Sequence, residues 1–189
     1  MKDSLIIRIF GHIKTISVHK KYVLYYCFKA RLFWQGIVHD FSKFSVEEFL
    51  PGVKYYTGKY SPNSVQKTIE GYSSSWLHHK SRNKHHFEFW LDYSDRDYVE
   101  KGEKISAIEM PPKYLVEMFC DRIAASKVYN GNQYKNSDPY DYYKMREDRM
   151  IIHDNTKKEL EKMLKYLAMY GEDKSFEYAR GLLKLNKNR

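Results

Sequence analysis

The chain has 189 residues, of which 42% are hydrophobic and 30% are charged, proportions that indicate a globular protein and exclude a disordered or fibrous one. Its formal net charge of +9 favours anionic partners such as nucleotides, nucleic acids or acidic membrane surfaces, although a solvated lysine surface explains the charge equally well. Its two cysteines form no CxxC pair, which argues against a zinc–thiolate site, and no apolar run reaches the about 20 residues of a membrane span.

The N-terminal third of the chain has a helical pattern. Apolar residues recur at helical spacing over residues 4–32, with a bend expected at Gly11. A second helix is predicted over residues 33–41. The capping-box sequence Ser45-Val46-Glu47-Glu48 predicts the start of a third helix, which Pro51-Gly52 is expected to end.

The remainder of the chain is also mainly helical in pattern. Residues 64–92 are predicted to be helical with breaks near Gly71 and Asn83, and the polar stretch 93–111 is predicted to be a loop. Further helices are expected over residues 112–129, from residue 140, over 154–171 and over 173–185. No segment alternates between apolar and polar residues as a strand does. The sequence therefore predicts an all-α fold, a single compact domain of about eight helices spanning residues 1–189.

A His-Asp pair, His39-Asp40, is the centre of the candidate site. It follows the apolar residues Ile37-Val38, so the chain emerges from the core there, and five of the eight histidines lie between residues 39 and 86. Imidazole and carboxylate are common ligands of catalytic divalent metals. The chain contains a second such pair, His153-Asp154, but there Asp154 is predicted to cap the following helix.

Other candidate ligands accompany His39-Asp40. His19 lies on the first helix, and the pairs His78-His79 and His85-His86 follow downstream. Asp121 is flanked by apolar residues, and a buried carboxylate without a partner is costly. A metal ion would satisfy it, and so would a salt bridge to a base such as Arg122.

The order of these residues resembles the HD-domain metal-dependent phosphohydrolase superfamily, and the segment His39-Asp40-Phe41-Ser42-Lys43 is similar to the HD-x-[GS]-K form of several of its branches. More closely, the chain resembles an uncharacterised bacterial and phage HD-like family, in the segments around His19, His39, Trp76–His86 and Met110–Asp121. The resemblance implies an HD-domain-like fold with its metal-site core over about residues 10–145 and C-terminal helices over 146–185.

The resemblance also implies the ligands of one or two divalent ions. His19, His39, Asp40 and Asp121 would hold one ion. Asp40 would bridge to a second ion, which the histidine pairs would complete: His78, His79, His85 and His86. His19 and His39 are 20 residues apart, a short separation for the superfamily, so His12 is kept as the alternative to His19. Mn, Fe, Mg, Ni, Co and Zn all remain candidates for the metal.

The member of each histidine pair that faces the metal depends on the local helix. If residues 78–86 form one helix, His78 and His85 share a face, because seven residues make nearly two turns. We therefore prefer His78 and His85 slightly and expect one histidine of each pair to make structural hydrogen bonds instead.

Basic and amide side chains near the pairs suit a phosphorylated substrate. Lys43 follows His39 by four residues, so on a helix it would lie on the same face and steady a phosphate oxygen. Predicted substrate contacts are Lys43, Lys80, Arg82 and Asn83, although a charged run is more often a solvated loop. Glu88 is a candidate partner that orients His85.

These residues predict a metal-dependent phosphohydrolase, either a phosphomonoesterase or a phosphodiesterase, acting on a nucleotide or similar small molecule. His39, Asp40 and Lys43 are the predicted catalytic residues. Two alternatives remain: an HD-type di-iron oxygenase that uses the same ligands, and a non-enzymatic basic nucleotide or nucleic-acid binder with a structural metal. Without a membrane span or a signal peptide, the protein is expected to be cytoplasmic with no membrane partner.

Overall fold

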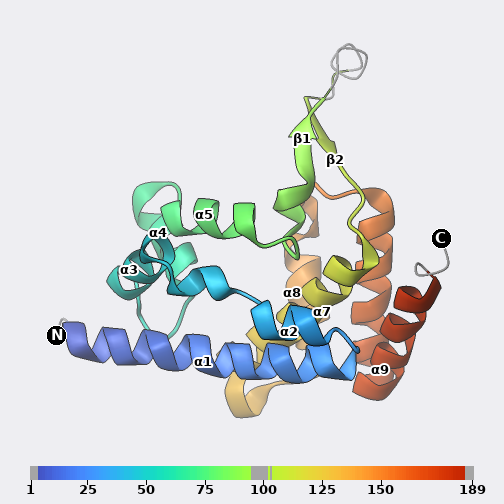
Figure 1. The fold of residues 1–189 in the computed structure, drawn as a ribbon, viewed down its shortest axis with the longest axis horizontal. Coiled ribbons are helices and arrows are strands. Elements are labelled where there is room, and N and C mark those ends of the chain that lie inside the picture. The colour runs from blue at the N-terminus through green and yellow to red at the C-terminus, as the bar shows by residue number, and fades with distance from the viewer. Residues whose placement is uncertain (1–3, 95–101, 103, 186–189) are drawn as a thin grey trace.

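The long helix α1 (Leu5–Lys29) lies along one side of the molecule, and α2, α3 and α7 make extensive contacts with it (Figure 1). The structure is a computed structural model and describes residues 4–94, 102 and 104–185. Within them it contains eight α-helices and one small sheet, so the all-α, single-domain prediction is confirmed. The other helices are α2 (Phe33–Val38), α3 (Val46–Lys54), α4 (Pro62–Glu70), α5 (Ser74–Arg82), α7 (Pro112–Asn130), α8 (Asp138–Arg146) and α9 (Asp154–Leu185).

The main core lies between the second half of α1 and helices α7 and α9. Val23 and Cys27 of α1 pack there with Phe119 of α7 and Phe176 of α9, all of them fully buried. Burial of each such large apolar side chain contributes about 1.5–3 kcal/mol. Both cysteines are buried in this core as free thiols.

Helices α3, α4 and α5 form a second group over the N-terminal half of α1 (Figure 1). Helix α2 lies on the C-terminal half of α1, and a 3-10 turn, η1 (Phe41–Phe44), connects α2 to α3. The segments that carry the predicted ligands therefore meet between the two groups of helices.

Helix α3 continues through Pro51-Gly52, where the sequence predicted its end. Pro51 lies in the second turn and removes a single helical hydrogen bond. Gly52 is required by packing, because a Cβ atom there would lie 2.2 Å from Nε2 of His12 on α1. Gly11 likewise marks no bend in α1, but it makes room for the ring of Tyr56.

The segment predicted as a loop over residues 93–111 contains one strand and the end of another. β1 (Leu91–Tyr93) pairs antiparallel with β2 (Ile105–Ala107), and residues 95–101 and 103 lie outside the described part. Three residues per strand are too few to show a period of two.

The two C-terminal helices were predicted correctly, because α9 breaks at Gly171, where φ is 76°.

The N-terminal part of α1 differs from the expected core pattern. Its apolar residues Leu5, Ile6 and Ile13 are exposed, whereas Val23 and Cys27 of the same helix are buried. None of the described helices is long and apolar enough to cross a membrane.

Glu172 ties three helices together at the α9 break. It accepts hydrogen bonds from Tyr26 Oη (2.7 Å) and Lys29 Nζ (3.1 Å) on α1 and from Lys127 Nζ (3.2 Å) on α7. Burial alone would raise the pKa of Glu172, but these donors outweigh it and hold the pKa below its usual value. A carboxylate whose pKa is lowered on folding stabilises the fold above its unfolded pKa and loses that effect as pH falls through the folded pKa.

We expect Glu172→Gln to lower the free energy of unfolding by on the order of 2 kcal/mol at neutral pH, because it removes charge-assisted hydrogen bonds. The difference from wild type should shrink below about pH 4, where the wild-type carboxylate is itself being protonated. Urea unfolding at neutral and acidic pH measures both values. Glu177→Gln is the matched control, since Glu177 makes one exposed pair with Lys174. An equal loss at both pH values would contradict this account.

Candidate metal centre

The His39-Asp40 pair lies at a sharp turn where α2 ends. His39 is the C-terminal cap of α2, and Asp40 has a left-handed backbone with φ of 53°. Lys20 of α1 holds this turn, because its Nζ donates to the carbonyl oxygens of Ile37 and His39, both at 2.9 Å. A left-handed backbone is unfavourable for most residues but tolerated by Asp, and the surrounding structure must maintain it. Both members of the pair are buried.

One set of candidate ligands joins this turn to α1 and α7. Nε2 of His19 lies 3.0 Å from Oδ1 of Asp121 and 3.7 Å from Oδ2 of Asp40. Nε2 of His39 lies 3.3 Å from Oδ2 of Asp40 and 3.6 Å from Oδ1 of Asp121. The four ligand atoms all lie within 4.8 Å of one another. We call His19, His39, Asp40 and Asp121 the first set.

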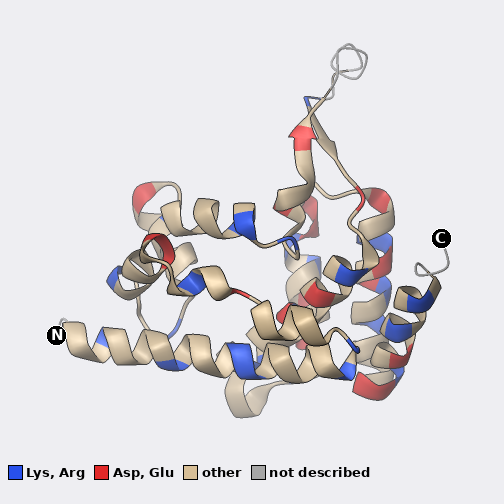
Figure 2. Cartoon of the chain, in the orientation of Figure 1, with Lys and Arg blue, Asp and Glu red and all other residues tan. Residues whose placement is uncertain are grey.

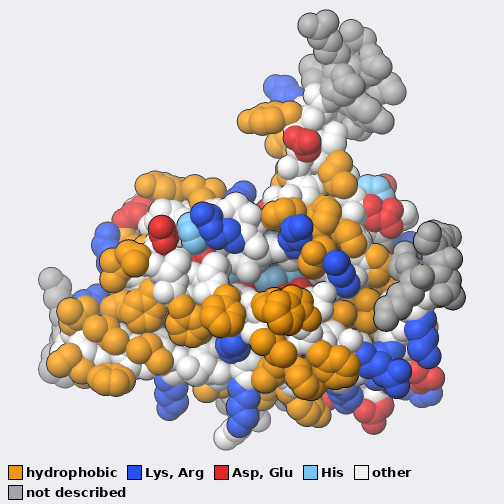
Figure 3. Space-filling view, in the orientation of Figure 1, with side chains coloured by type: hydrophobic (Ala, Val, Ile, Leu, Met, Phe, Trp, Pro, Cys, Tyr) orange, Lys and Arg blue, Asp and Glu red, His pale blue; other side chains and the backbone are white. Residues whose placement is uncertain are grey.

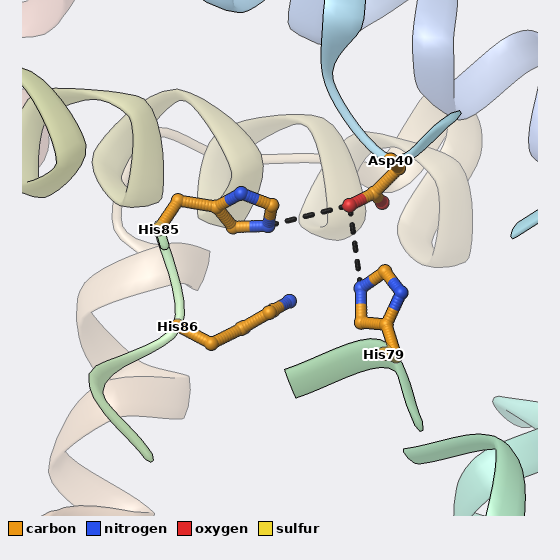
Figure 4. Close-up of side chains that lie close together, drawn as sticks. All are labelled: Asp40, His79, His85 and His86. Atoms are coloured by element: carbon orange, nitrogen blue, oxygen red, sulfur yellow. Dashed lines mark ion pairs between the residues drawn. The ribbon is translucent and has the colours of Figure 1, made fainter. Parts of the chain in front are cut away.

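A second set surrounds the other oxygen of Asp40 (Figure 4). Nε2 of His79 on α5 and Nε2 of His85 lie 3.2 Å and 3.3 Å from Oδ1 of Asp40. The side chain of His86 points into the same space. We call Asp40, His79, His85 and His86 the second set. Asp40 belongs to both sets, with one oxygen directed to each.

Several polar atoms of the two sets are buried without a hydrogen-bond partner: Nε2 of His19, His39, His85 and His86, and Oδ1 of Asp40. A buried polar atom without a partner costs about 1–3 kcal/mol. Within each set the ligand atoms lie within 4.8 Å of one another, close enough for one ion to contact all of them. Divalent cations bound there would satisfy them, and a donor set of imidazoles and carboxylates suits first-row transition metals.

The opposite nitrogens of the ring ligands are held by two buried glutamates. Nδ1 of His39 and Nδ1 of His85 donate to Oε1 of Glu117, at 2.9 Å and 3.2 Å. Nδ1 of His79 donates to Oε2 of Glu48 at 2.7 Å. A proton on Nδ1 leaves the lone pair on Nε2, which faces the candidate metal centre. Metal-binding histidines are usually held by such a hydrogen bond from the other ring nitrogen. His39, His85 and Glu117 are therefore a hydrogen-bonded support and not a third metal site.

Neither glutamate is predicted from the sequence as a partner of the histidine ligands. Glu48 was interpreted as part of a capping box, but its side chain bonds to histidines of α5, and the Ser45 side chain makes no capping bond. Glu117 precedes Asp121 by four residues and so shares its helix face, a spacing that could have identified it. The predicted partner Glu88 has a buried oxygen without a hydrogen bond and is not bonded to His85.

The charges of two of the ligands, Asp40 and His86, match a metal-binding role. Burial alone would raise the pKa of Asp40, but His39, Lys43 and His79 hold that pKa well below its usual value, so the carboxylate is ionised. Burial lowers the pKa of His86 well below its usual value, and His85 and His79 add to this effect, so the ring is a neutral donor.

Lys43 is directed at Asp40. Its Nζ lies 2.5 Å from Oδ2 of Asp40. The predicted helix face shared by His39 and Lys43 does not form, because α2 ends at Val38. Burial would lower the pKa of Lys43, but Asp40 and Asp121 outweigh this and raise it, so the ammonium stays protonated.

The structure brings together seven of the eight predicted ligands, and His78 is the exception. Nδ1 of His78 donates to Oε1 of Glu48 at 2.8 Å, and His78 lies in neither set. The single helix over residues 78–86, on which the preference for His78 rested, is not formed, because α5 ends at Arg82 and the chain turns before His85.

Of the other predicted site residues, Asn83 has a structural role. Its Nδ2 donates to Oγ of Ser42 and to the carbonyl of His79, both at 2.8 Å, which ties the end of α5 to η1. Arg82 is exposed and contacts Ser81. Lys80 and Arg82 remain predicted substrate contacts.

The two alternative histidine sites lie elsewhere. His12, the alternative to His19, packs against Phe49 with ring centroids 5.5 Å apart and is in neither set. At the second His-Asp pair, His153 provides the cap of α9 in place of Asp154, because its Nδ1 accepts from the backbone N–H of Asn155 at 3.3 Å.

The shared position of Asp40 predicts how metal content responds to substitution. Asp121→Asn should lose the ion of the first set, His86→Gln the ion of the second, and Asp40→Asn both. Elemental analysis after loading with Mn²⁺ and desalting measures this. His78→Gln is the matched control and should keep both ions. Equal losses from all variants, or a loss from the control, would contradict the assignment of two sets.

The comparisons with known proteins give a family but no activity. Residues 8–166 match a family of unknown function, DUF5662. No curated protein and no solved structure matches the chain. The matched range contains every residue of both ligand sets, together with Glu48 and Glu117. Because the match covers most of the sequence, the chain belongs to the DUF5662 family.

Proposed function

We propose that the protein is a metal-dependent phosphohydrolase with a two-metal centre, related to the HD-domain superfamily. The observation that supports this most directly is the position of Asp40, whose two oxygens face two separate groups of imidazoles. A carboxylate in that position can bridge two cations about 3.5–4 Å apart, the spacing of two-metal hydrolytic sites. The order of ligands along the chain agrees with the resemblance described above.

The residues of the site fit hydrolysis of a phosphoester. Divalent cations bound there would lower the pKa of a coordinated water and polarise a phosphoryl oxygen. Glu48 and Glu117 keep the imidazoles in the tautomer that binds metal. Lys43 adds a protonated ammonium beside Asp40, where it can stabilise the negative charge that develops on phosphoryl oxygens.

A nucleotide or similar small phosphorylated molecule is the proposed substrate. The net charge of +9 favours an anionic ligand, and the basic residues Lys80 and Arg82 follow the ligand His79 on α5. In the proposed reaction, water attacks phosphorus and an alcohol is released, so no oxidant is consumed.

The first test compares phosphate release by wild type and Asp40→Asn, with Mn²⁺ and a panel of nucleotides and aryl phosphates. Asparagine is nearly isosteric and tolerates the left-handed backbone, so the fold should be retained. We expect at least about a hundredfold loss of kcat, since both ligand sets lose their shared charge. Circular dichroism confirms folding.

His153→Ala is the control for this test, because His153 belongs to the other His-Asp pair and should keep full activity. Activity that persists in Asp40→Asn would contradict the proposal. Oxygen consumption by the iron-loaded protein would indicate an oxygenase instead. Salt-dependent nucleic-acid binding without turnover would indicate a binding protein.

A second test concerns Lys43. Lys43→Ala should lower kcat about a hundredfold while metal content is retained, because it removes a positive charge and no ligand. Lys43→Arg should restore part of the activity, since it restores the charge. Steady-state kinetics with elemental analysis measure both effects. If alanine and arginine variants were equally impaired, or if metal were lost, Lys43 would not act through its charge on the substrate.

A further inference from the structure

A large apolar surface is exposed beside the metal centre (Figure 3). Phe10 on α1 is 68% exposed, Trp34 on α2 is 69% exposed and Phe41 in η1 is 62% exposed. The name docking face is used below for the surface formed by Ile6, Phe10, Ile13, Phe33, Trp34, Ile37, Phe41 and Leu50. Single exposed apolar residues are normal, but a group of this extent marks an interaction surface.

The α1 part of the docking face follows from helical spacing. Ile6, Phe10 and Ile13 continue into Leu24 and Phe28 at helical intervals. The later residues contact α2, because a Cβ atom on Gly36 would lie 3.3 Å from the Leu24 side chain and the rings of Phe28 and Phe33 lie 5.0 Å apart, although Phe28 is still 45% exposed. In the first half of the same stripe, Ile6 and Phe10 are more exposed, at 65% and 68%, although they are as apolar.

An apolar hollow extends the docking face at the N-terminal end. It lies between α1 and α3, has a volume of about 340 Å³, and is lined by apolar side chains with two basic residues at its edge. The apolar lining is Leu5, Ile9, Phe49, Leu50 and Val53, and the basic residues are Arg8 and Lys54.

The segment that carries the docking face has an excess of basic residues. Residues 4–54 contain eight Lys and Arg but three Asp and Glu, of which Asp40 and Glu48 are buried, so Glu47 alone is an exposed acid in this range. Figure 2 shows basic and no acidic residues along α1. Lys14 and Lys21 are exposed beside the apolar stripe.

We infer that this face docks onto the surface of an anionic lipid bilayer. Exposed Trp, Phe and Leu side chains bordered by lysines are typical of proteins that lie at the membrane interface, where rings enter the headgroup layer and lysines meet acidic lipids. A second copy of the chain fits less well, because a two-fold contact would bring the same basic face of both copies together.

The inference revises the expectation of no membrane partner, which rested on the lack of a spanning segment. Peripheral docking needs no span. In Figure 3 histidine side chains are visible among the apolar groups of the same face. Docking would therefore place this histidine-containing surface near the headgroups.

The test is co-sedimentation with vesicles of phosphatidylcholine alone and of phosphatidylcholine mixed with phosphatidylglycerol. We expect binding to the anionic vesicles only, weakened by salt. Two double variants should each bind the anionic vesicles with at least about tenfold lower affinity. One is Phe10→Ser with Trp34→Ser, and the other is Lys14→Glu with Lys21→Glu.

Control substitutions lie on α9, away from this face: Met169→Ser for the apolar pair and Lys158→Glu for the lysines, both at exposed positions. These should bind as wild type does. No binding to anionic vesicles, or equal binding by all variants, would overturn the inference. A wild-type dimer that becomes monomeric on Phe10→Ser with Trp34→Ser, without vesicle binding, would show self-association instead. None of these outcomes depends on catalysis.

Discussion

The burial of Asp40 among imidazoles is the constraint on which the rest of the structure depends. A carboxylate removed from water is costly unless its charge is compensated. Here Lys43 contacts one oxygen, and the two oxygens face Nε2 atoms of His85 and His39 that have no hydrogen bond within the described residues. The left-handed backbone of Asp40 and the bonds from Lys20 to the same turn hold it there. The fold thus holds Asp40 in an arrangement that is unfavourable in free energy and that bound cations would stabilise.

Two glutamates extend this constraint through the fold. Glu117 lies one turn before Asp121 on α7, so the register of one helix positions a candidate ligand and the support of two others, His39 and His85. Glu48 of α3 likewise holds the imidazole of His79 on α5 by a hydrogen bond. The packing of α3 on α5 and of α7 on α1 is therefore part of the site, because a shift of either helix would turn an imidazole away.

Local patterns predicted most of the helices and the identity of the ligands, but not how they meet. Helical periodicity and the order of His and Asp residues lie within short windows of sequence. The role of Glu48 depends on contact with His79, 31 residues later, and no local pattern distinguishes it from a capping residue. The choice between His78 and His79 depended on where α5 ends, which is the least certain part of a sequence-based assignment. Periodicity likewise identified the apolar stripe of α1 but not whether another helix covers it.

Helix α1 connects these features, since it has several functions along its length. Its buried face packs in the core through Val23 and Cys27, and His19, one turn before Val23 on the same face, reaches the metal centre. Its remaining apolar stripe contacts α2 in one half and is more exposed at Ile6 and Phe10 in the other. Stability alone does not explain that exposure, because substitution of Phe10 by a polar residue would remove little buried area and lower the risk of aggregation. The exposed half of α1 is better explained by a partner surface beside the metal centre than by the packing of the fold.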